Sequence, residues 1–304
     1  MYDYDKICSI AKSLNCKLFL NESMNRHTSF NIGGNADVFI EVNDKASLKS
    51  LLRSINERNI PYFVFGNGSN LLVSDKGIRG IVLKLGGKFC NVSLVDDVTV
   101  ECGAGALLSK ACIFALRNSL GGLEFAFGIP GTVGGAAYMN AGAYGSEMKN
   151  VLICCNHVTK SGQEESFFSE DLAFSYRRSV YSNTSHILTG VTIKLKKDDP
   201  LHIKQNMDDF IRRRKDKQPL NYPSAGSIFK RPVGNFAGTL IEKCGLKGKS
   251  IGGAMVSRKH AGFIVNTGEA TCQNVIDLID HIKAVVFEKT GIILECEVKL
   301  VGEI

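Results

Sequence analysis

Four short segments in the second half of the chain carry side chains suited to anion binding or acid–base chemistry. The segments are YRRS (176–179), PSAGSIFKRP (223–232), SRKHAGFIVN (257–266) and LECEVKL (294–300). Arg177 offers a charged, planar donor fork for a carboxylate, Ser227 lies in a turn of small residues, and Glu297 lies on the charged side of an alternating segment. Each also has a structural interpretation: Arg177 as a surface or ion-pair residue, Ser227 as a turn-capping serine, and Glu297 as part of an ordinary half-exposed strand.

Three glycine-rich segments lie in the first half of the chain, and none of them contains a Lys or Arg. They are GNGSNLLVSD (66–75), ECGAGAL (101–107) and GIPGTVGGAAYMNAGAYG (128–145). The first fits either a tight turn or a cradle of main-chain N–H groups for phosphate, although it matches neither the GxGxxG nor the GxxxxGK[ST] pattern. The second fits either close helix–strand packing or a second wall of the same ligand site.

The third glycine-rich segment has three possible interpretations: a flexible linker, a packed turn in the core, or a main chain that lies directly against a flat ligand. Apolar residues such as Ile129, Val133 and Met139 argue against a linker. Only glycine lets a main chain approach a ligand closely. Because the three segments lack basic residues, a large, mostly apolar cofactor that carries a diphosphate fits them better than ATP does.

Helices and strands alternate along the chain and must position these segments. Helical periodicity predicts helices over 47–59, 106–119, 201–217, 236–245 and 272–291. Apolar or alternating runs predict strands over 60–65, 79–85, 97–102, 151–160, 186–195 and 292–301. This order predicts an α+β or α/β chain, which we divide into three parts, 1–85, 86–199 and 200–304.

Length and composition indicate a globular protein of 304 residues, 44% hydrophobic, with a net charge of +7 that is too mild to predict nucleic-acid binding. The basic run RRRK (212–215) predicts a solvated helix face, with a site for an anionic ligand as the alternative. The N-terminal segment lacks the pattern of a signal peptide and no apolar run approaches 18 residues, so we expect a cytoplasmic protein without membrane insertion. Ten cysteines with no CxxC pair predict reduced, buried thiols and no metal site.

Six motifs together give the chain a resemblance to one family, the bacterial UDP-N-acetylenolpyruvoylglucosamine reductases of peptidoglycan synthesis. The matching runs are HTSFNIGG (27–34), GNGSNLLVSD, GIPGTVGGAAYMNAGAYG, YRRS, PSAGSIFKRP and LECEVKL, and they occur in the order typical of the family. Each motif is weak alone, whereas all six in order make a specific match.

The resemblance implies an α+β fold in which the first two parts bind FAD non-covalently, as in flavoproteins of the vanillyl-alcohol-oxidase type. The third part is then an α+β domain that binds the nucleotide sugar. The glycine-rich main chain is expected to lie against FAD, and residues 66–71 are expected to hold its diphosphate. The implied FAD-binding residues are Gly66, Asn67, Gly68, Ser69, Asn70, Leu71, Gly103, Ala104, Gly105, Ile129, Pro130, Gly131, Thr132, Gly134, Gly135, Asn140, Gly142 and Ala143.

The resemblance also implies a reaction in two halves. NADPH reduces the flavin and leaves, and the enolpyruvyl ether of UDP-N-acetylglucosamine then takes a hydride at C3 and a proton at C2 to give UDP-N-acetylmuramate. By motif alignment, Arg177 binds the carboxylate, Ser227 donates the proton, and Glu297, if protonated, donates a hydrogen bond to the enolate oxygen. Arg178 and Glu295 are neighbours that the sequence alone does not exclude. The implied substrate contacts are Tyr176, Tyr222, Lys230 and Arg231.

The chain departs from part of the family in length. Only 50 positions separate Arg177 from Ser227, so the chain is similar to the shorter subclass that lacks an added tyrosine-bearing loop. Two other functions remain open from the residues: a flavin oxidase of the same cofactor fold that acts on a small alcohol or sugar, and a flavin- or nucleotide-binding protein without chemistry. An oxidase would not need the AGSIFK run together with a carboxylate on the last strand.

Overall fold

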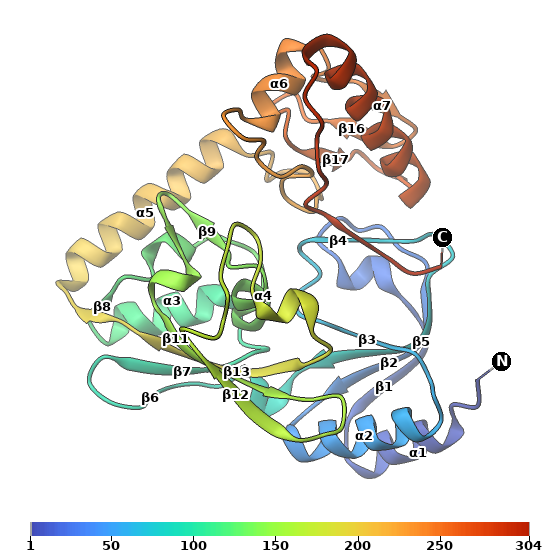
Figure 1. Cartoon of the computed structure of the whole chain (residues 1–304), viewed down its shortest axis with the longest axis vertical. Helices are drawn as coiled ribbons and strands as arrows, with labels where there is room; N and C mark the ends of the chain where they lie inside the picture. Colours follow the sequence, from blue (N-terminus) through green and yellow to red (C-terminus); the bar gives the residue numbers. More distant parts are fainter. Residues whose placement is uncertain (1, 304) are drawn as a thin grey trace. The chain divides into compact units, whose positions relative to one another are not determined.

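The computed structural model describes residues 2–303, which group into two compact units (Figure 1). Within these residues, the first unit contains 2–20, 38–67 and 80–213, and the second contains 21–37, 68–79 and 214–303. Each unit has a hydrophobic core of its own. The division into 1–85, 86–199 and 200–304 stays a prediction.

The first unit is built on two sheets. A four-stranded sheet, most of which belongs to this unit, has the order β1-β2-β5-β3, with β1 (Lys17–Ser23), β2 (Asn35–Val42), β3 (Tyr62–Phe65) and β5 (Ile78–Leu85). A five-stranded sheet has the order β12-β11-β13-β7-β6, with β6 (Val92–Leu94), β7 (Thr99–Gly103), β11 (Leu152–Val158), β12 (Glu164–Phe168) and β13 (Ile187–Lys194). Two short pairs complete the strands of this unit: β8 (Leu120–Gly121) with β14 (Lys196–Lys197), and β9 (Gly142–Ala143) with β10 (Ser146–Glu147).

Helices of the first unit form where the sequence has apolar residues at helical spacing. They are α1 (Asp5–Ser13), α2 (Lys45–Glu57), α3 (Leu108–Arg117), α4 (Val133–Tyr138) and most of α5 (Pro200–Lys217), together with the 3₁₀ turns η2 (Gly87–Cys90), η3 (Glu124–Ala126), η4 (Met148–Asn150) and η5 (Val180–Asn183). Helix α2 begins after Asp44, whose carboxylate accepts a hydrogen bond of 2.9 Å from the main-chain N–H of Ser47. The predicted apolar face of α2 is fully buried: Leu48, Leu51, Leu52 and Ile55.

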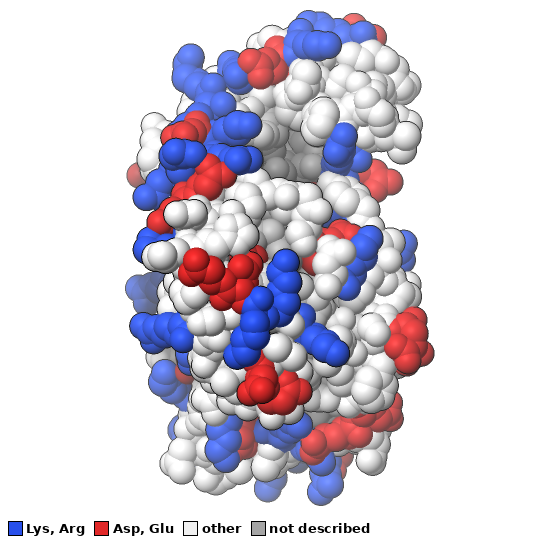
Figure 2. All heavy atoms as spheres, turned by 90° about the vertical axis from the view of Figure 1, so that its left-hand side faces the viewer, with Lys and Arg blue, Asp and Glu red and all other residues white. Residues whose placement is uncertain are grey.

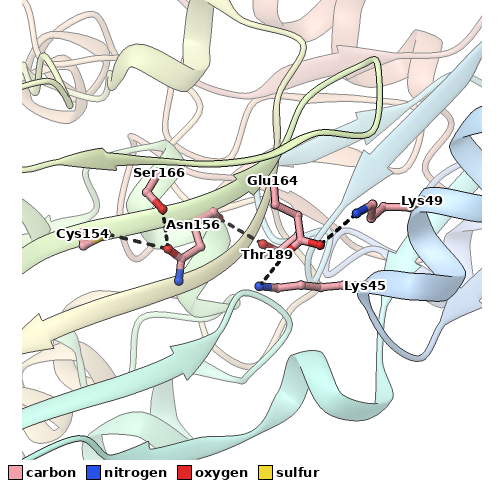
Figure 3. A network of polar contacts seen from close by, with 7 residues as sticks. All are labelled: Lys45, Lys49, Cys154, Asn156, Glu164, Ser166 and Thr189. Atoms are coloured by element: carbon pink, nitrogen blue, oxygen red, sulfur yellow. Dashed lines mark hydrogen bonds and ion pairs between the residues drawn. The ribbon is translucent and has the colours of Figure 1, made fainter.

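Polar contacts join the five-stranded sheet to helix α2 within the first unit (Figure 3). Glu164 on β12 accepts ion-pair contacts from Lys49 at 3.0 Å and Lys45 at 3.4 Å. On the neighbouring strand β11, the side-chain oxygen of Asn156 accepts a hydrogen bond of 2.8 Å from Ser166, and its main-chain carbonyl accepts one of 3.2 Å from Thr189 on β13. Strand β12, at the edge of the sheet, is therefore held to β11 and to the helix by side chains as well as by its ladder.

The second unit packs two helices against short strands. Its regular elements are η1 (Met24–His27), β4 (Leu71–Val73), α6 (Ala237–Lys243), β15 (Ser250–Ile251), β16 (Ala254–Val256), β17 (Ile264–Asn266), α7 (Cys272–Thr290) and β18 (Lys299–Val301). Strands β15, β16 and β17 form an antiparallel sheet, and β18 pairs in parallel with β4. Helix α7 begins with a capping box between Thr271 and Asn274 and ends at Gly291, whose φ of 70° is the left-handed conformation that glycine adopts readily.

Three local predictions differ from the structure. The segment 128–145 contains a short helix, α4, which its many glycines obscured because glycine disfavours helix. The predicted last strand is regular only over 299–301, although Cys296 makes an isolated bridge to Phe229. Ser227 caps no helix, because it lies in an extended segment that bridges to Phe263.

The cysteines and the charged surface agree with expectation, except that Cys8, Cys90, Cys154 and Cys296 are only partly buried. All ten cysteines are free thiols, and burial raises the pKa of Cys102 to about 12, with Glu101 adding to the shift. In the basic run, Arg212 and Arg213 both pair with Asp209 on exposed α5, and Figure 2 shows basic and acidic side chains interspersed over the face it presents. No helix within residues 2–303 has both the length and the apolar character that crossing a bilayer requires.

Candidate active site

The turn at 103–105 belongs to the packing of the first unit. All three of its main-chain N–H groups donate to carbonyl groups of the same unit, at 2.8–3.1 Å. A Cβ atom at Gly103 would lie 2.1 Å from the carbonyl oxygen of Phe89, and one at Gly105 would lie 2.3 Å from that of Leu85. Close packing therefore explains both glycines, and these N–H groups have no capacity left for a phosphate. A contact of this turn with FAD stays a prediction.

The turn that contains Gly68 and Asn70 differs in this respect. Among residues 2–303, the main-chain N–H groups of these two residues donate to no acceptor. Gly68 is buried, with a φ of 61°, and a Cβ there would lie 2.2 Å from the carbonyl oxygen of His27 in the same unit. A buried N–H group without a partner is rare in folded proteins. The turn therefore presents the donors that a phosphate group requires.

Helix α4 gives its two central glycines different surroundings. Thr132 precedes the helix, and its hydroxyl accepts a hydrogen bond of 3.1 Å from the N–H of Gly135. A Cβ at Gly134 would lie 2.7 Å from the Cβ of Ala104, so Gly134 is required by packing within the unit. Gly135 is exposed, and among residues 2–303, apart from its chain neighbours and the backbone of α4 itself, the only atom within 4 Å of a Cβ there is the Thr132 hydroxyl oxygen, at 3.4 Å. The open side of the segment is thus at Gly135, and a Cβ at Gly66, in the same unit, would meet the same hydroxyl at 2.5 Å.

Other predicted FAD-binding residues flank α4 in the first unit. Ile129, Pro130 and Gly131 form the segment before the helix, and Gly131 has a φ of 138°. Gly142 and Ala143 form β9, whose hairpin turn has positive φ at both Tyr144 and Gly145. A Cβ at Gly142 would lie 2.7 Å from that of Glu147, so its glycine also has a packing reason.

Asn140 ties the glycine-rich segment to the loop that carries Arg177. It is fully buried, and its amide nitrogen donates to the carbonyl of Ser175 at 3.1 Å, while its side-chain oxygen accepts from the N–H of Lys149 at 3.0 Å. The hydroxyl of Ser179, which we did not single out from the sequence, donates to the carbonyl of Tyr138 at 2.8 Å. These side chains act as positioning groups for the loop, because all their partners lie in the first unit.

Arg177 lies at the tip of a tight turn closed by Ser175 and Arg178, whose main chains exchange hydrogen bonds of 3.1 and 3.2 Å. Its φ of 58° is unusual for a residue with a side chain, and strained positions of this kind cluster at functional sites. Its guanidinium lies 5.3 Å from the centre of the half-exposed Tyr176 ring. Arg178 is exposed and donates to Asn183 at 3.0 Å, so its surroundings are those of a surface residue.

In the second unit, Ser227 begins an extended segment that is paired on both sides. Ile228 donates to the carbonyl of Gly262 at 2.9 Å, and the carbonyl of Ile228 accepts from the N–H of Glu297 at 2.7 Å. Gly226, with a φ of 76°, has open space around it. The hydroxyl of Ser227 is half-exposed and makes no hydrogen bond to any group among residues 2–303.

The two glutamates of the last segment have different environments. Glu295 is 70% exposed at its side chain and forms an ion pair of 2.7 Å with Lys230, which holds the pKa of this carboxyl below its ordinary value. Glu297 is half-buried, and its main-chain carbonyl accepts a hydrogen bond of 3.1 Å from the side chain of Asn70. The environment therefore distinguishes Glu297, which the motif alignment chose, from the solvated Glu295.

The remaining predicted residues of the second unit lie near these two segments in sequence. The Arg231 guanidinium stacks 3.9 Å from the centre of the Phe236 ring, and Tyr222 is 41% exposed. Ser69 lies between Gly68 and Asn70 in the turn described above, and Leu71 begins β4. A residue that the sequence analysis did not single out, Ser29, donates its hydroxyl to the carbonyl of Ser224 at 2.7 Å and so holds the loop that precedes Ser227.

Comparison with known proteins agrees with this arrangement. Residues 218–301 match the family model described as UDP-N-acetylenolpyruvoylglucosamine reductase, C-terminal domain, and residues 36–166 match the model described as FAD binding domain. The chain is 49% identical over 299 residues to the UDP-N-acetylenolpyruvoylglucosamine reductase of Caldanaerobacter subterraneus subsp. tengcongensis, with 98% of each chain covered. It is 44% identical over 299 residues to that of Streptococcus pneumoniae (strain JJA), again with 98% of each covered.

The chain belongs to the UDP-N-acetylenolpyruvoylglucosamine reductase family. The crystal structure of the reductase from Thermus caldophilus has a TM-score of 0.80 and 36% identity, and covers 94% of this chain and 98% of that one. These matches confirm the predicted family and the predicted fold class, an FAD-binding region followed by a C-terminal α+β domain. The roles of individual site residues remain predictions in this reductase-family chain.

We expect Gly135→Val to abolish FAD binding without unfolding the protein, because the valine side chain would fill the open space beside α4. The measurement is the visible flavin absorbance of the purified protein together with its thermal unfolding. Ala284→Val on α7, also exposed, is the matched control and should keep its flavin. Gly134→Val should instead destabilise the fold, because of the 2.7 Å contact with Ala104. A folded, yellow Gly135→Val protein would contradict the assignment of this face to FAD.

Proposed function

We propose that this chain reduces the enolpyruvyl ether of UDP-N-acetylglucosamine to UDP-N-acetylmuramate, with NADPH as the hydride donor and non-covalently bound FAD as cofactor. One observation carries the proposal: the chain is 49% identical, over 98% of its length, to a UDP-N-acetylenolpyruvoylglucosamine reductase. The reaction supplies a peptidoglycan precursor. The proposed substrates are small molecules, and the proposed location of the enzyme is the cytoplasm.

The residues present fit FAD. The unpartnered N–H groups of Gly68 and Asn70 would hold its diphosphate, and the exposed face at Gly135 would accept its flat ring system without a side chain in the way. When bound, FAD accepts a hydride from NADPH and supplies one to the substrate.

Arg177 is proposed to bind the substrate carboxylate. Reduction at C3 leaves negative charge at C2, which spreads into this carboxylate, so a fixed cation there stabilises the transition state more than the ground state. The left-handed turn and the contacts of Asn140 and Ser179 hold the loop before substrate arrives. Such preorganisation avoids the cost of ordering the loop during the reaction.

Ser227 and Glu297 are proposed to complete the reaction at C2. The hydroxyl of Ser227 has no protein partner among residues 2–303 and is available to give its proton to C2. The main-chain N–H of Glu297 donates to the carbonyl of Ile228, the residue that follows Ser227. A protonated carboxyl on Glu297 would donate a hydrogen bond to the enolate oxygen. Tyr176, Tyr222, Lys230 and Arg231 are proposed substrate contacts, with Arg231 directed at a phosphate.

The assay that tests the proposed function measures NADPH oxidation by the purified yellow protein with and without the enolpyruvyl substrate. We expect rapid oxidation only when the substrate is present, with UDP-N-acetylmuramate as the product. Oxidation of NADPH at the expense of oxygen and independent of substrate would favour a flavin oxidase instead. A colourless protein that cannot be reconstituted with FAD would contradict every flavoenzyme interpretation.

We expect Arg177→Lys to lower kcat/KM for the enolpyruvyl substrate by about 10- to 100-fold, the effect of losing one charge-assisted hydrogen bond. Arg178→Lys is the matched control from the same turn and should stay close to the parent, because its partner is Asn183 on the surface. Steady-state kinetics with varied substrate make the measurement. Equal effects of the two substitutions would remove Arg177 from the site.

Ser227→Ala separates the two half-reactions. NADPH should still bleach the flavin at the parent rate, because that step needs no serine, whereas reoxidation by the enolpyruvyl substrate should slow by about 10²- to 10⁴-fold. Stopped-flow absorbance follows both steps. Ser227→Cys should keep part of the activity, since a thiol also delivers a proton, and Ser224→Ala in the same loop is the control. Reoxidation at the parent rate in Ser227→Ala would show that the proton comes from another group.

A further inference from the structure

Three side chains that the reductase chemistry does not use gather on the five-stranded sheet of the first unit. His157 on β11 lies directly opposite Glu165 on β12, and His186 immediately precedes β13. One possible ligand atom from each residue lies within 4.8 Å of the other two. The His157 Nε2 and a carboxylate oxygen of Glu165 are 3.7 Å apart, which is beyond hydrogen-bond distance.

Both imidazole rings have a buried nitrogen that lacks a partner. Among residues 2–303, neither Nε2 of His157 nor Nδ1 of His186 makes a hydrogen bond, and His157 is 1% exposed. Leaving a buried polar atom unpaired costs about 1–3 kcal/mol. Two unpaired ring nitrogens near a carboxylate are suited to bind a group that accepts lone pairs, such as a metal ion.

Tyr181 contacts the second ring nitrogen of His157. Its hydroxyl lies 3.0 Å from Nδ1 of His157 and 3.4 Å from the carbonyl of Cys155. When the tyrosine proton is directed at the Cys155 carbonyl, the hydroxyl oxygen can accept the N–H of Nδ1, and this tautomer leaves the lone pair on Nε2 for a ligand. A hydrogen bond of this kind, from the second ring nitrogen to an oxygen, accompanies nearly every metal-bound histidine in proteins.

The surroundings hold one of the three groups firmly and leave the other two adjustable. The His157 ring stacks against the rings of Phe167 and His186, each with its centre 4.6 Å away. Glu165 is exposed, and His186 lines a surface pocket of about 470 Å³ together with residues 159–161. Strand β12 is anchored on either side of Glu165 by the ion pairs of Glu164 and the hydrogen bond of Ser166 (Figure 3). An ion can therefore enter from solvent and meet one fixed and two movable ligands.

We propose that His157, Glu165 and His186 form a binding site for a divalent transition-metal ion of the Zn²⁺ class, with water in the remaining coordination position. Two imidazole nitrogens and one carboxylate oxygen are an established ligand set for Zn²⁺. Tetrahedral coordination at about 2.0–2.1 Å requires the donor atoms to be about 3.3 Å apart. Donor atoms that lie within 4.8 Å of one another need to close by up to about 1.5 Å, which requires rotation of the exposed Glu165 and of His186 out of its stack on His157.

The proposed ion joins β11, β12 and the start of β13, so its role is to stabilise this sheet and not to take part in the reduction. The proposal departs from the expectation of no metal site, which rested on the cysteine pattern. Histidines at 157 and 186 carry no recognisable spacing in the sequence, and only the pairing of the strands brings them together. An ion that binds the folded state alone raises the unfolding temperature as its concentration rises.

The test uses the full-length protein, freed of metal by dialysis against a chelator and titrated with Co²⁺ and Zn²⁺. We expect one Co²⁺ per chain, with the strong visible absorption of a four-coordinate ion, displacement of Co²⁺ by Zn²⁺, and a higher unfolding temperature with either ion. His186→Gln and Glu165→Gln should each weaken binding by about 10- to 100-fold while leaving reductase activity unchanged. Their matched controls are His202→Gln on exposed α5 and Glu164→Gln, which is adjacent to Glu165 but paired with Lys45 and Lys49.

Either of two results would overturn the proposal. One is failure of the metal-free parent to bind a stoichiometric ion at micromolar concentrations. The other is parent-like affinity in both His186→Gln and Glu165→Gln, which would place any bound ion at another group, such as a thiol. Because both altered side chains are at least partly accessible to solvent, these variants test the site without relying on replacement of the buried His157.

Discussion

The main-chain pairing of Ile228 is the contact on which the proposed roles of Ser227 and Glu297 in the second unit depend. Ile228 donates to Gly262 and accepts from Glu297, so one fully buried residue sets the positions of both the segment that carries Ser227 and the segment that carries Glu297. Hydrogen bonds between main chains are insensitive to side-chain rotation, which makes them suitable for holding two functional groups at a constant separation. The side chain of Asn70 also donates a hydrogen bond to the carbonyl of Glu297. This bond connects the segment that carries Glu297 to the turn that contains Gly68 and Asn70, in the same unit.

The first unit uses a different means to hold Arg177. Here buried polar side chains, Asn140 and Ser179, connect the glycine-rich segment to the turn that bears the arginine. Each of these side chains hydrogen-bonds to main-chain atoms, so the loop is held without a regular strand or a helix. Arg177 therefore keeps a left-handed main-chain conformation. The surrounding contacts stabilise it, although such a conformation costs about 1–3 kcal/mol.

Glycine serves two purposes in this fold, and the surroundings of each residue separate them. Gly103, Gly105, Gly134 and Gly142 are small because another part of the protein occupies the space a Cβ would take. Gly135 has open space beside it, and Gly68 combines a left-handed main chain with an unpartnered N–H group. Packing within the protein thus explains the glycines of the first kind, and a contact of either kind with FAD stays a prediction.

The sequence by itself determined the family, the fold class and five of the seven α-helices of residues 2–303, all except α1 and α4, because these depend on local periodicity and on motifs whose order along the chain is specific. It identified Arg177, Ser227 and Glu297 as candidates, but it left Arg178 and Glu295 as equal neighbours and offered two interpretations for each glycine-rich turn. The tertiary structure distinguished Arg177 from Arg178 by the partner Asn183, and Glu297 from Glu295 by the ion pair with Lys230. It also brought His157, Glu165 and His186 together across three strands. The Arg178–Asn183 contact is local and depends on the conformation of one loop, whereas the Glu295–Lys230 pair and the His157 cluster depend on the register between segments far apart in the chain, which no local pattern of residues encodes.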